Sequence, residues 1–325
     1  MKIACDLFTS SIKFQVITKT ILKKIKKNFP NVEIINTKNK KFSKKLPDVN
    51  IYWGNRIDAN LINKMPNLKW IHYGSTGVDT RVLEIANKKK IILTNSRRFF
   101  DEAVASTVLA FIFIMARGVN FSFYLKNNKK LKRDFYNDIT KNIQNVFGQK
   151  ILFVGFGGIA KKIAKVCKAM DMKIFAIKKN KMKIKGVKLY NINNLKKAAK
   201  GKNYIVNLLP YTNETKKIFD IAFFSQMDKN SFFINAGRGE TVNEVDLVNA
   251  IKRKFFLGAA LDVVENEPIQ TNSKLLKFNN IIVTPHIAGI TNDYWTKQYD
   301  LFFNNLKKFK KSKKLQNVMK NEIGY

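Results

Sequence analysis

Short apolar runs alternate with amphipathic stretches along the first third of the chain. Each run is bounded by polar residues or glycine, a pattern typical of buried strands. We predict strands over Lys2–Asp6, Val32–Asn36, Val49–Trp53, Leu68–Tyr73 and Lys90–Thr94. Strand signals that alternate with helix signals indicate a mostly parallel sheet covered on both faces.

A second series of the same kind begins at Gln149. It predicts strands over Lys150–Val154, Lys173–Ile177, Tyr204–Leu208, Ser231–Asn235, Leu257–Val263 and Asn280–Thr284. Helical stretches such as Gly158–Met170 and Asn243–Ile251 lie between them. This alternation is typical of a doubly wound nucleotide-binding sheet, so the predicted fold class is α/β.

Three further segments complete the pattern. Asp101 to about Leu125 predicts one long helix, and the Lys-rich stretch from Lys126 to Asn145 predicts a loop or linker. The tail from Thr291 to Lys311 predicts another helix. With 325 residues, the chain is long enough for two domains of ordinary size.

The charge is unusual. Lys and Arg number 61 against 23 Asp and Glu, which gives a formal net charge of +38. Such an excess is typical of proteins that bind nucleic acid or membranes. The excess is mostly Lys, is scattered along the chain, and accompanies Asn, Ile and Phe, whose codons are A/T-rich. We therefore interpret it as compositional and expect no nucleic-acid partner, although it would still attract an anionic substrate.

Other classes are disfavoured by what the chain lacks. Two cysteines, Cys5 and Cys167, cannot make a disulfide framework, and with two histidines they provide no metal-binding spacing. The longest apolar run, Ala103 to Ala116, is too short to span a bilayer. The start of the chain has no apolar core of signal-peptide length. We expect a cytoplasmic protein with no metal and no membrane contact.

A glycine-rich turn follows the first strand of the second series. Gly155, Gly157 and Ala160 fit the pattern G-x-G-x-x-A, within a unit from Gln149 to Lys178 that spans 178 − 149 + 1 = 30 residues. Gly155 would make the tight turn, Gly157 would let the backbone approach a pyrophosphate, and Ala160 would pack helix on strand. The helix start, with Gly158 and Ile159, would bind the phosphates. A plain glycine turn is the alternative, and the context favours the dinucleotide site.

The end of the next strand bears on the choice of cofactor. An acid there would bind the ribose 2′-hydroxyl of NAD, whereas a basic residue accommodates the 2′-phosphate of NADP. Here the strand ends in Lys178 and Lys179, and no acid is present. The missing carboxylate favours NADP, with NAD possible.

Three charged side chains each follow a different strand of the second series. Arg238 lies between two glycines, Glu267 directly precedes a proline, and His286 lies in a Pro and Gly turn. Ligands bind at the carboxyl ends of strands in such sheets. Glu265 competes with Glu267 for the role of the acid, and His72 is expected to be structural.

At these residues the chain resembles the D-isomer-specific 2-hydroxyacid dehydrogenase family. The matching segments are GFGGIA, NLLPYTNET, INAGRGETVNEVDL, GAALDVVENEP and TPHIAG, which together cover roughly Gly148 to Leu306. LKWIHYGSTGVD, from Leu68 to Asp79, matches the family's substrate loop. NLLP with TNET and the missing acid are most similar to the NADP-dependent glyoxylate/hydroxypyruvate reductases.

The resemblance implies catalytic and substrate-binding roles. Arg238 would hold the carboxylate and keto oxygen of a 2-oxoacid, a task that suits a guanidinium fork. His286 would protonate the carbonyl oxygen as hydride arrives, and Glu267 would pair with it and orient its ring. The amides around Ser75, Thr76 and Gly77 would bind the substrate carboxylate.

It also implies further cofactor contacts. Asp262 would contact the nicotinamide carboxamide, and the other residues of this group would line the cofactor: Leu209, Pro210, Thr215, Ala236 and Gly289. Trp53 and Trp295 could line the pocket or belong to the core.

By resemblance we expect a flavodoxin-like substrate domain, residues 1–97 plus 290–325, into which a Rossmann cofactor domain, residues 98–289, is inserted. The active site would lie in the cleft between them, and closure would exclude water. The helix from Asp101 would form a homodimer contact. Because the chain ends at Tyr325, we expect no added regulatory domain.

The predicted function is reduction of a small 2-oxoacid, such as glyoxylate or hydroxypyruvate, by NADPH. The alternative is a nucleotide-sensing regulatory or nucleic-acid-associated protein on the same fold, since a fold does not fix a function. An intact set of Arg238, Glu267 and His286 favours the enzyme, because a sensor has no need of it.

Overall fold

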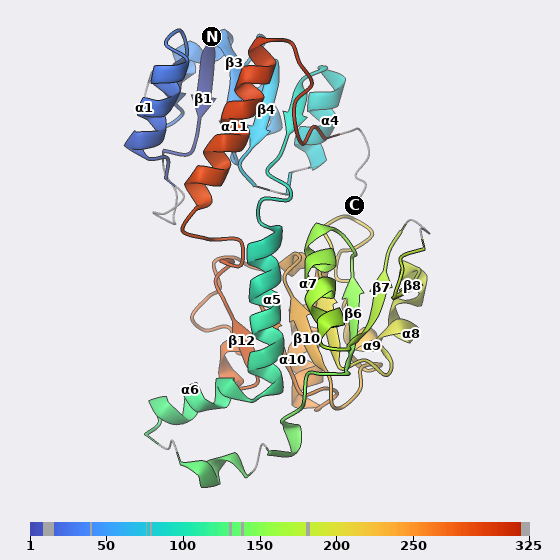
Figure 1. The fold of residues 1–325 in the computed structure, drawn as a ribbon. Helices are drawn as coiled ribbons and strands as arrows, with labels where there is room; N and C mark the ends of the chain where they lie inside the picture. Colours follow the sequence, from blue (N-terminus) through green and yellow to red (C-terminus); the bar gives the residue numbers. More distant parts are fainter. Residues whose placement is uncertain are drawn as a thin grey trace. The chain divides into compact units, whose positions relative to one another are not determined.

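The computed structural model describes residues 1–8, 16–39, 41–75, 77–78, 80–129, 132–137, 140–179 and 183–319. Its contacts divide the chain into two compact units (Figure 1). Unit 1 is Met1–Phe100 together with the C-terminal segment from Thr291, and unit 2 is Asp101–Ile290.

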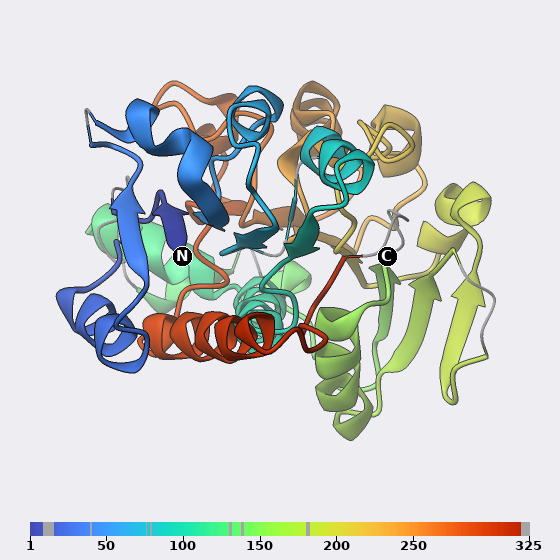
Figure 2. The same cartoon turned by 90° about the horizontal axis from the view of Figure 1, so that it is seen from above.

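The described part of unit 1 is built on a five-stranded parallel sheet of order β2-β1-β3-β4-β5, the flavodoxin-like arrangement. Its strands are β1 (Lys2–Cys5), β2 (Glu33–Asn36), β3 (Val49–Gly54), β4 (Trp70–Tyr73) and β5 (Ile92–Thr94). Its helices are α1 (Lys19–Asn28), α2 (Phe42–Lys45), α3 (Ala59–Asn63), α4 (Thr80–Lys88) and α11 (Tyr294–Lys310), with the short 3-10 turn η2 (Leu46–Asp48). Helices α1 and α11 cover one face, and α2, α3 and α4 cover the other (Figure 2).

Unit 2 contains, among its described residues, a seven-stranded parallel sheet of order β12-β11-β10-β9-β6-β7-β8. Taken in chain order, this is the doubly wound Rossmann arrangement with one added strand. The strands are β6 (Lys150–Val154), β7 (Lys173–Ile177), β8 (Val187–Tyr190), β9 (Tyr204–Asn207), β10 (Phe232–Asn235), β11 (Gly258–Leu261) and β12 (Ile281–Val283). The order reverses between β6 and β9, where ligands bind in such sheets.

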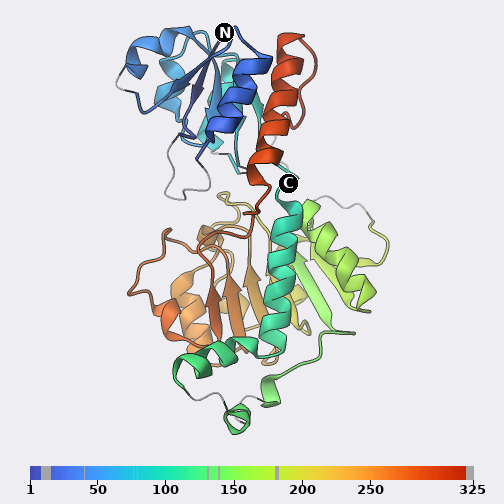
Figure 3. The ribbon, with the colours of Figure 1, turned by 60° about the vertical axis from the view of Figure 1, so that its left-hand side comes forward.

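Helices cover both faces of the sheet in unit 2. Helices α5 (Asp101–Ala116) and α7 (Gly158–Ala169) pack on one face (Figure 3). The opposite face carries α8 (Leu195–Ala199), α9 (Ile221–Phe224) and α10 (Glu244–Lys252). Helix α6 (Val119–Asn127) follows α5, and 3-10 turns connect the rest: η3 (Arg133–Tyr136), η4 (Thr140–Asn142), η5 (Ile192–Asn194), η6 (Gly239–Thr241) and η7 (Lys274–Lys277).

The predicted α/β fold class is confirmed, and the strands follow the apolar runs because both faces of the sheet are covered. In β6, for example, Ile151, Leu152, Phe153 and Val154 have no exposed surface. Such a strand needs a continuous apolar run and not an alternating one. The same burial explains why the ends of the strands that we predicted lie within a few residues of the observed ends.

The prediction of one long helix from Asp101 to Leu125 is wrong. The chain makes two helices, α5 and α6, which are bent by 72° relative to each other. Gly118 between them has φ +64°, a left-handed conformation that ends a helix and that glycine adopts at little cost. Within the described ranges no single helix is both long and apolar enough to cross a membrane, and this bent pair passes the length and composition test only when taken together.

The edge strand β8 was not predicted. Its four residues are half-buried or exposed, so the segment carries no apolar run. The predicted linker from Lys126 to Asn145 contains the end of α6 and the turns η3 and η4, and parts of it lie outside the described residues.

Aromatic residues form the core beneath α11. Trp53 is fully buried and stacks on Phe302, with ring centroids 3.9 Å apart. His72 is also fully buried, with Nδ1 2.7 Å from Thr94 Oγ1, and burial lowers the pKa of His72 to about 3. His72 is therefore a neutral core residue and Trp53 a packing residue.

Candidate active site

The strand register brings the ends of four strands to one edge of the sheet in unit 2. Asn207 at the end of β9 pairs with Asn235 of β10, which pairs with Leu261 of β11, which in turn pairs with Val283 of β12. Residues that follow β10, β11 and β12 therefore emerge side by side. Arg238, Glu267 and His286 lie in those three segments.

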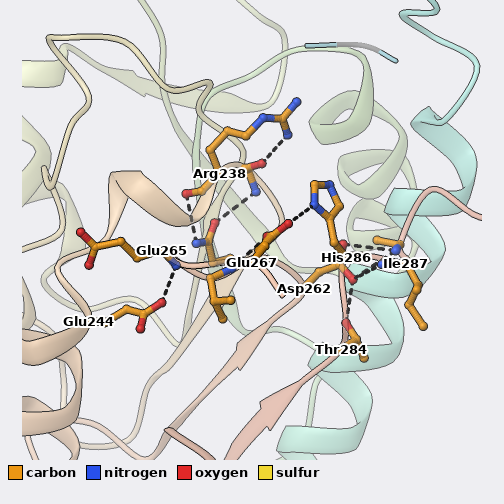
Figure 4. A network of polar contacts seen from close by, with 12 residues as sticks. Arg238, Glu244, Asp262, Glu265, Glu267, Thr284, His286 and Ile287 are labelled. Atoms are coloured by element: carbon orange, nitrogen blue, oxygen red, sulfur yellow. Dashed lines mark hydrogen bonds and ion pairs between the residues drawn. The ribbon is translucent and has the colours of Figure 1, made fainter. Parts of the chain in front are cut away.

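His286 and Glu267 form a direct pair. The distance between His286 Nδ1 and Glu267 Oε2 is 2.7 Å (Figure 4). Burial raises the pKa of Glu267, but the hydrogen bond and charge of His286, with the charge of Arg238, outweigh burial and hold this pKa below its ordinary value. An ionised carboxylate can only accept, so Nδ1 carries the hydrogen and Nε2 remains free to exchange a proton with a ligand.

A buried carboxylate holds the segment that carries His286. Asp262 Oδ1 accepts hydrogen bonds from Thr284 Oγ1 at 2.7 Å, Ile287 N at 3.0 Å and Ala288 N at 3.1 Å. His286 itself has φ +54°, an uncommon conformation for a residue with a side chain. Such a conformation persists where surrounding contacts enforce it, and Asp262 supplies those contacts.

Arg238 extends from the turn after β10. Its Nη1 donates to Gly237 O at 2.7 Å, and in Figure 4 its side chain and that of His286 both extend above the Glu267 carboxylate. A Cβ on Gly237 would lie 2.6 Å from Leu209 O, and one on Gly239 would overlap the Val264 carbonyl. The two flanking glycines are therefore required by neighbouring backbone, and they leave Arg238 as the side chain that this turn presents.

Three buried polar residues position that turn, and sequence reasoning did not single them out. Asn207 Nδ2 donates to Asn235 Oδ1 and to Thr241 Oγ1, both at 2.8 Å. Thr241 Oγ1 in turn donates to Arg238 O at 2.6 Å. The available signal was an Asn at the end of two neighbouring strands, in NLLP and in INAGRG.

The structure distinguishes the two candidate acids, Glu265 and Glu267, by their partners. Glu265 pairs with Lys217 at 2.7 Å, and its backbone N–H donates to Glu244 Oε1 at 2.5 Å. Glu267 is the carboxylate that reaches His286.

The glycine turn after β6 fits a dinucleotide. Gly155 has φ +94°, and a Cβ there would lie 3.1 Å from Leu208 O. A Cβ on Gly157 would meet nothing within 4 Å, so this backbone can be approached closely from outside. Gly157 is the N-cap of α7 and has no side chain that could accept from the helix-start amides, and a helix start of this kind is a common anion-binding site.

Two members of the turn have packing roles. A Cβ on Gly158 would overlap the Asp101 carboxylate, so glycine is needed there for the start of α5. Ala160 is fully buried in the core between α7 and α5, and Ile159 is partly buried against that core.

The segments that flank the turn carry the other predicted cofactor residues. Lys178 is half-buried, and the more exposed Lys179 places Nζ 3.3 Å from Glu214. Leu209 and Pro210 are partly exposed at the end of β9. Thr215 Oγ1 donates to Pro210 O at 2.7 Å, so this hydroxyl closes the turn instead of facing outward. Ala236 and Gly289 are half-buried beside Arg238 and His286 in sequence.

The predicted substrate loop belongs to unit 1. Ser75 and Gly77 follow β4, and Ser75 Oγ donates to Gly77 O at 2.9 Å. Thr76 lies outside the described residues. Nowhere in the described ranges do three or more His, Cys, Asp or Glu side chains gather as metal ligands would.

Comparisons with known proteins agree with this geometry. Residues 109–288 match the family model described as "D-isomer specific 2-hydroxyacid dehydrogenase, NAD binding domain". The chain is 31% identical to a probable 2-ketogluconate reductase of Dictyostelium discoideum over 73% of this chain and 71% of that protein. It is 26% identical to a glyoxylate reductase of Aeropyrum pernix over 82% and 81% of the two chains.

The fold is shared with solved structures. An NADPH-dependent glyoxylate/hydroxypyruvate reductase from Sinorhizobium meliloti superposes with a TM-score of 0.80 and 22% identity, over 100% of this chain and 99% of that one. Together with the matched family model, these findings confirm the predicted resemblance and the predicted class of enzyme, an oxidoreductase of 2-hydroxyacids. The chain belongs to the D-isomer specific 2-hydroxyacid dehydrogenase family.

Proposed function

We propose that this protein reduces small 2-oxoacids, such as glyoxylate or hydroxypyruvate, to the corresponding 2-hydroxyacids with NADPH. The observation that carries the proposal is the His286–Glu267 pair at 2.7 Å beside Arg238, at the carboxyl edge of a Rossmann sheet. The similarity to proteins named glyoxylate reductase supports the choice of substrate.

The residues divide the work as follows. Arg238 binds the carboxylate and keto oxygen of the substrate, since its guanidinium offers parallel N–H donors. Protonated His286 donates the Nε2 proton to the carbonyl oxygen, while Glu267 accepts the Nδ1 hydrogen bond and stabilises the imidazolium. A reduced nicotinamide, when bound, supplies the hydride that the carbonyl carbon accepts. The balanced reaction converts 2-oxoacid, NADPH and one proton into 2-hydroxyacid and NADP⁺.

The remaining predicted residues bind the cofactor and the substrate carboxylate. We propose that unit 2 is the cofactor domain, in which Gly155, Gly157 and the start of α7 bind the pyrophosphate and Lys178 binds the 2′-phosphate. Among the described residues, Asp262 Oδ2 accepts one long bond, from Ala288 N at 3.2 Å, so it retains the capacity to bind a carboxamide. In unit 1, the substrate domain, the amides of Ser75 and Gly77 would bind the carboxylate.

A homodimer and a cytoplasmic location belong to the same proposal. Helices α5 and α6 leave large apolar side chains exposed that a second copy would cover: Phe113, Val119, Phe123 and Tyr124. Sedimentation at micromolar concentration should give the mass of a dimer, and the mass of a single chain would contradict it. The high charge needs no nucleic acid in this proposal.

Turnover tests the function directly. We expect the purified protein to oxidise NADPH in the presence of glyoxylate or hydroxypyruvate, and to oxidise NADH less efficiently. The measurement is absorbance of the reduced cofactor across a panel of 2-oxoacids. Absence of turnover with both cofactors would overturn the proposal, and tight binding to duplex DNA at physiological salt would then favour the nucleic-acid alternative.

Replacing Arg238 should separate substrate binding from cofactor binding. Arg238→Ala should lower kcat/KM by about 10²–10³-fold, because the donors to the substrate oxygens are lost. NADPH affinity, measured by fluorescence titration, should change little. Arg253→Ala is the control, since Arg253 is a cation that lies against Phe255 after α10. If Arg238→Ala lowered kcat/KM and the affinity for NADPH by the same factor, Arg238 would have a structural role.

The two neighbouring acids provide a matched pair of variants. Glu267→Gln keeps an acceptor for His286 but removes the charge, and should lower kcat by about 10²-fold. Glu265→Gln should leave kcat nearly unchanged, because Glu265 pairs with Lys217. Steady-state kinetics of both variants makes the comparison. Similar losses in the two would show that the effect is not specific to the acid that contacts His286.

Cofactor choice can be tested at the end of β7. Lys178→Asp should raise the KM for NADPH about 10- to 100-fold, since a charged hydrogen bond to the 2′-phosphate is lost and repulsion added. The KM for NADH should fall. Lys173→Asp, at the exposed start of the same strand, is the control. An unchanged ratio of the two KM values in Lys178→Asp would place 2′-phosphate recognition elsewhere.

A further inference from the structure

Three consecutive backbone carbonyls of the predicted substrate loop each have a hydrogen-bonding partner elsewhere in unit 1. The Tyr73 carbonyl lies 2.9 Å from Ser96 Oγ, the Gly74 carbonyl accepts from Gln298 Nε2 at 2.5 Å, and the Ser75 carbonyl accepts from Ser96 N at 3.0 Å. Only two residues, Ser96 and Gln298, supply these contacts. Both belong to unit 1, but Gln298 comes from α11, more than 200 residues later in the chain.

Gln298 is a buried amide, and its side chain hydrogen-bonds Tyr294 on the same helix as well as the substrate loop. Its side chain is on the buried face of α11, which also carries Tyr294, Tyr299 and Phe302, and the residue is 2% exposed. Burial of an amide is costly unless its groups are hydrogen-bonded. Here both ends are used, since Nε2 donates to Gly74 O and Oε1 lies 3.0 Å from Ser96 Oγ.

The held carbonyls determine where the amides of this loop point. In a trans peptide the C=O of one residue and the N–H of the next point in opposite directions. A Gly74 carbonyl fixed on Gln298 therefore directs the Ser75 N–H to the other side of the backbone. Within the described residues, that N–H has no acceptor in the chain. Among the described residues it is therefore an oriented donor without an acceptor, as a ligand-binding amide would be.

We propose that Gln298 is a positioning residue for the substrate carboxylate. It acts through the Gly74 peptide, whose plane it fixes, and does not itself contact substrate. The inference rests on the proposed function, in which the amides of Ser75 and Gly77 bind the carboxylate of a 2-oxoacid. It assigns α11 a role in substrate affinity beyond completing the core of unit 1.

Gln298→Met tests this directly, because methionine has a similar volume but offers no N–H. The Gly74 carbonyl is then unanchored and the Ser75 donor loses its fixed direction. We expect the KM for glyoxylate and the Ki of oxalate, a dicarboxylate with no reducible carbonyl, to rise together by about tenfold or more. The kcat and the affinity for NADPH should stay within about twofold, since neither depends on this peptide.

Asn305→Leu provides a matched control. Asn305 is another fully buried amide on α11, and it bonds to Gln316 O at 3.1 Å and Gln316 N at 2.7 Å instead of to the substrate loop. Its replacement removes buried hydrogen bonds from the same helix, so it should lower thermal stability while leaving the KM and Ki unchanged. A merely structural role for Gln298 predicts that the two variants behave alike.

Each outcome distinguishes this inference from the proposed function. If the unsubstituted protein turns over no 2-oxoacid, the proposed function fails. If it does turn over, and Gln298→Met leaves KM and Ki unchanged or Asn305→Leu raises them equally, the positioning role is overturned. Should Gln298→Met not fold, Ser96→Ala decides in its place. It removes the contact of Ser96 Oγ with Gln298 Oε1, which holds the amide against Gly74, but keeps the backbone N–H on Ser75 O. It must raise KM and Ki without lowering kcat.

Discussion

One buried carboxylate, that of Asp262, holds together the part of the molecule on which the chemistry depends. Its Oδ1 accepts from Thr284, Ile287 and Ala288, and so fixes the backbone on both sides of His286. Without that anchor, the left-handed conformation of His286 would be disfavoured by about 1–2 kcal/mol. The imidazole would then form its hydrogen bond to Glu267 in only a fraction of molecules. A side chain that need not touch substrate thereby determines whether the acid and its partner are aligned.

The same separation, between exposed side chains that would contact a ligand and buried side chains that position them, recurs throughout the site. The side chains that we propose to act on substrate are more exposed. Those of His286 and Glu267 are 49% and 35% exposed, so their pair contributes little to stability. The residues that position them are buried amides and hydroxyls: Asn207, Asn235 and Thr241 behind Arg238, and Gln298 and Ser96 behind the substrate loop. Buried polar groups are costly when unpaired and rigid when satisfied, which makes them suited to holding a backbone in one arrangement.

The sequence was sufficient to predict the strands and the motif residues, because both depend on a local pattern. Apolar runs marked nearly every strand, because strands covered on both faces must be continuously apolar, and the motif residues Arg238, Glu267 and His286 each follow such a run. The edge strand β8 was missed because an edge needs no apolar run, and the bend at Gly118 because a single glycine within an apolar helix gives a weak signal. The role of Gln298 depends on a contact between residues more than 200 positions apart, and no local pattern predicts it.

The net charge of +38 explains why the groups that would bind the substrate need fixed directions. Ion pairs of the described residues, such as Lys2–Asp48 and Lys162–Glu102, are largely solvent-exposed, so they neither balance the excess nor stabilise the fold by much. A surface of this kind attracts any anion, and it raises the encounter rate of a 2-oxoacid and of unwanted anions alike. Discrimination between a 2-oxoacid and other anions must then come from the geometry of the binding groups. In the proposed function, a planar guanidinium and oriented amides discriminate a 2-oxoacid by the placement of its oxygens, and buried hydrogen bonds fix the directions of these donors.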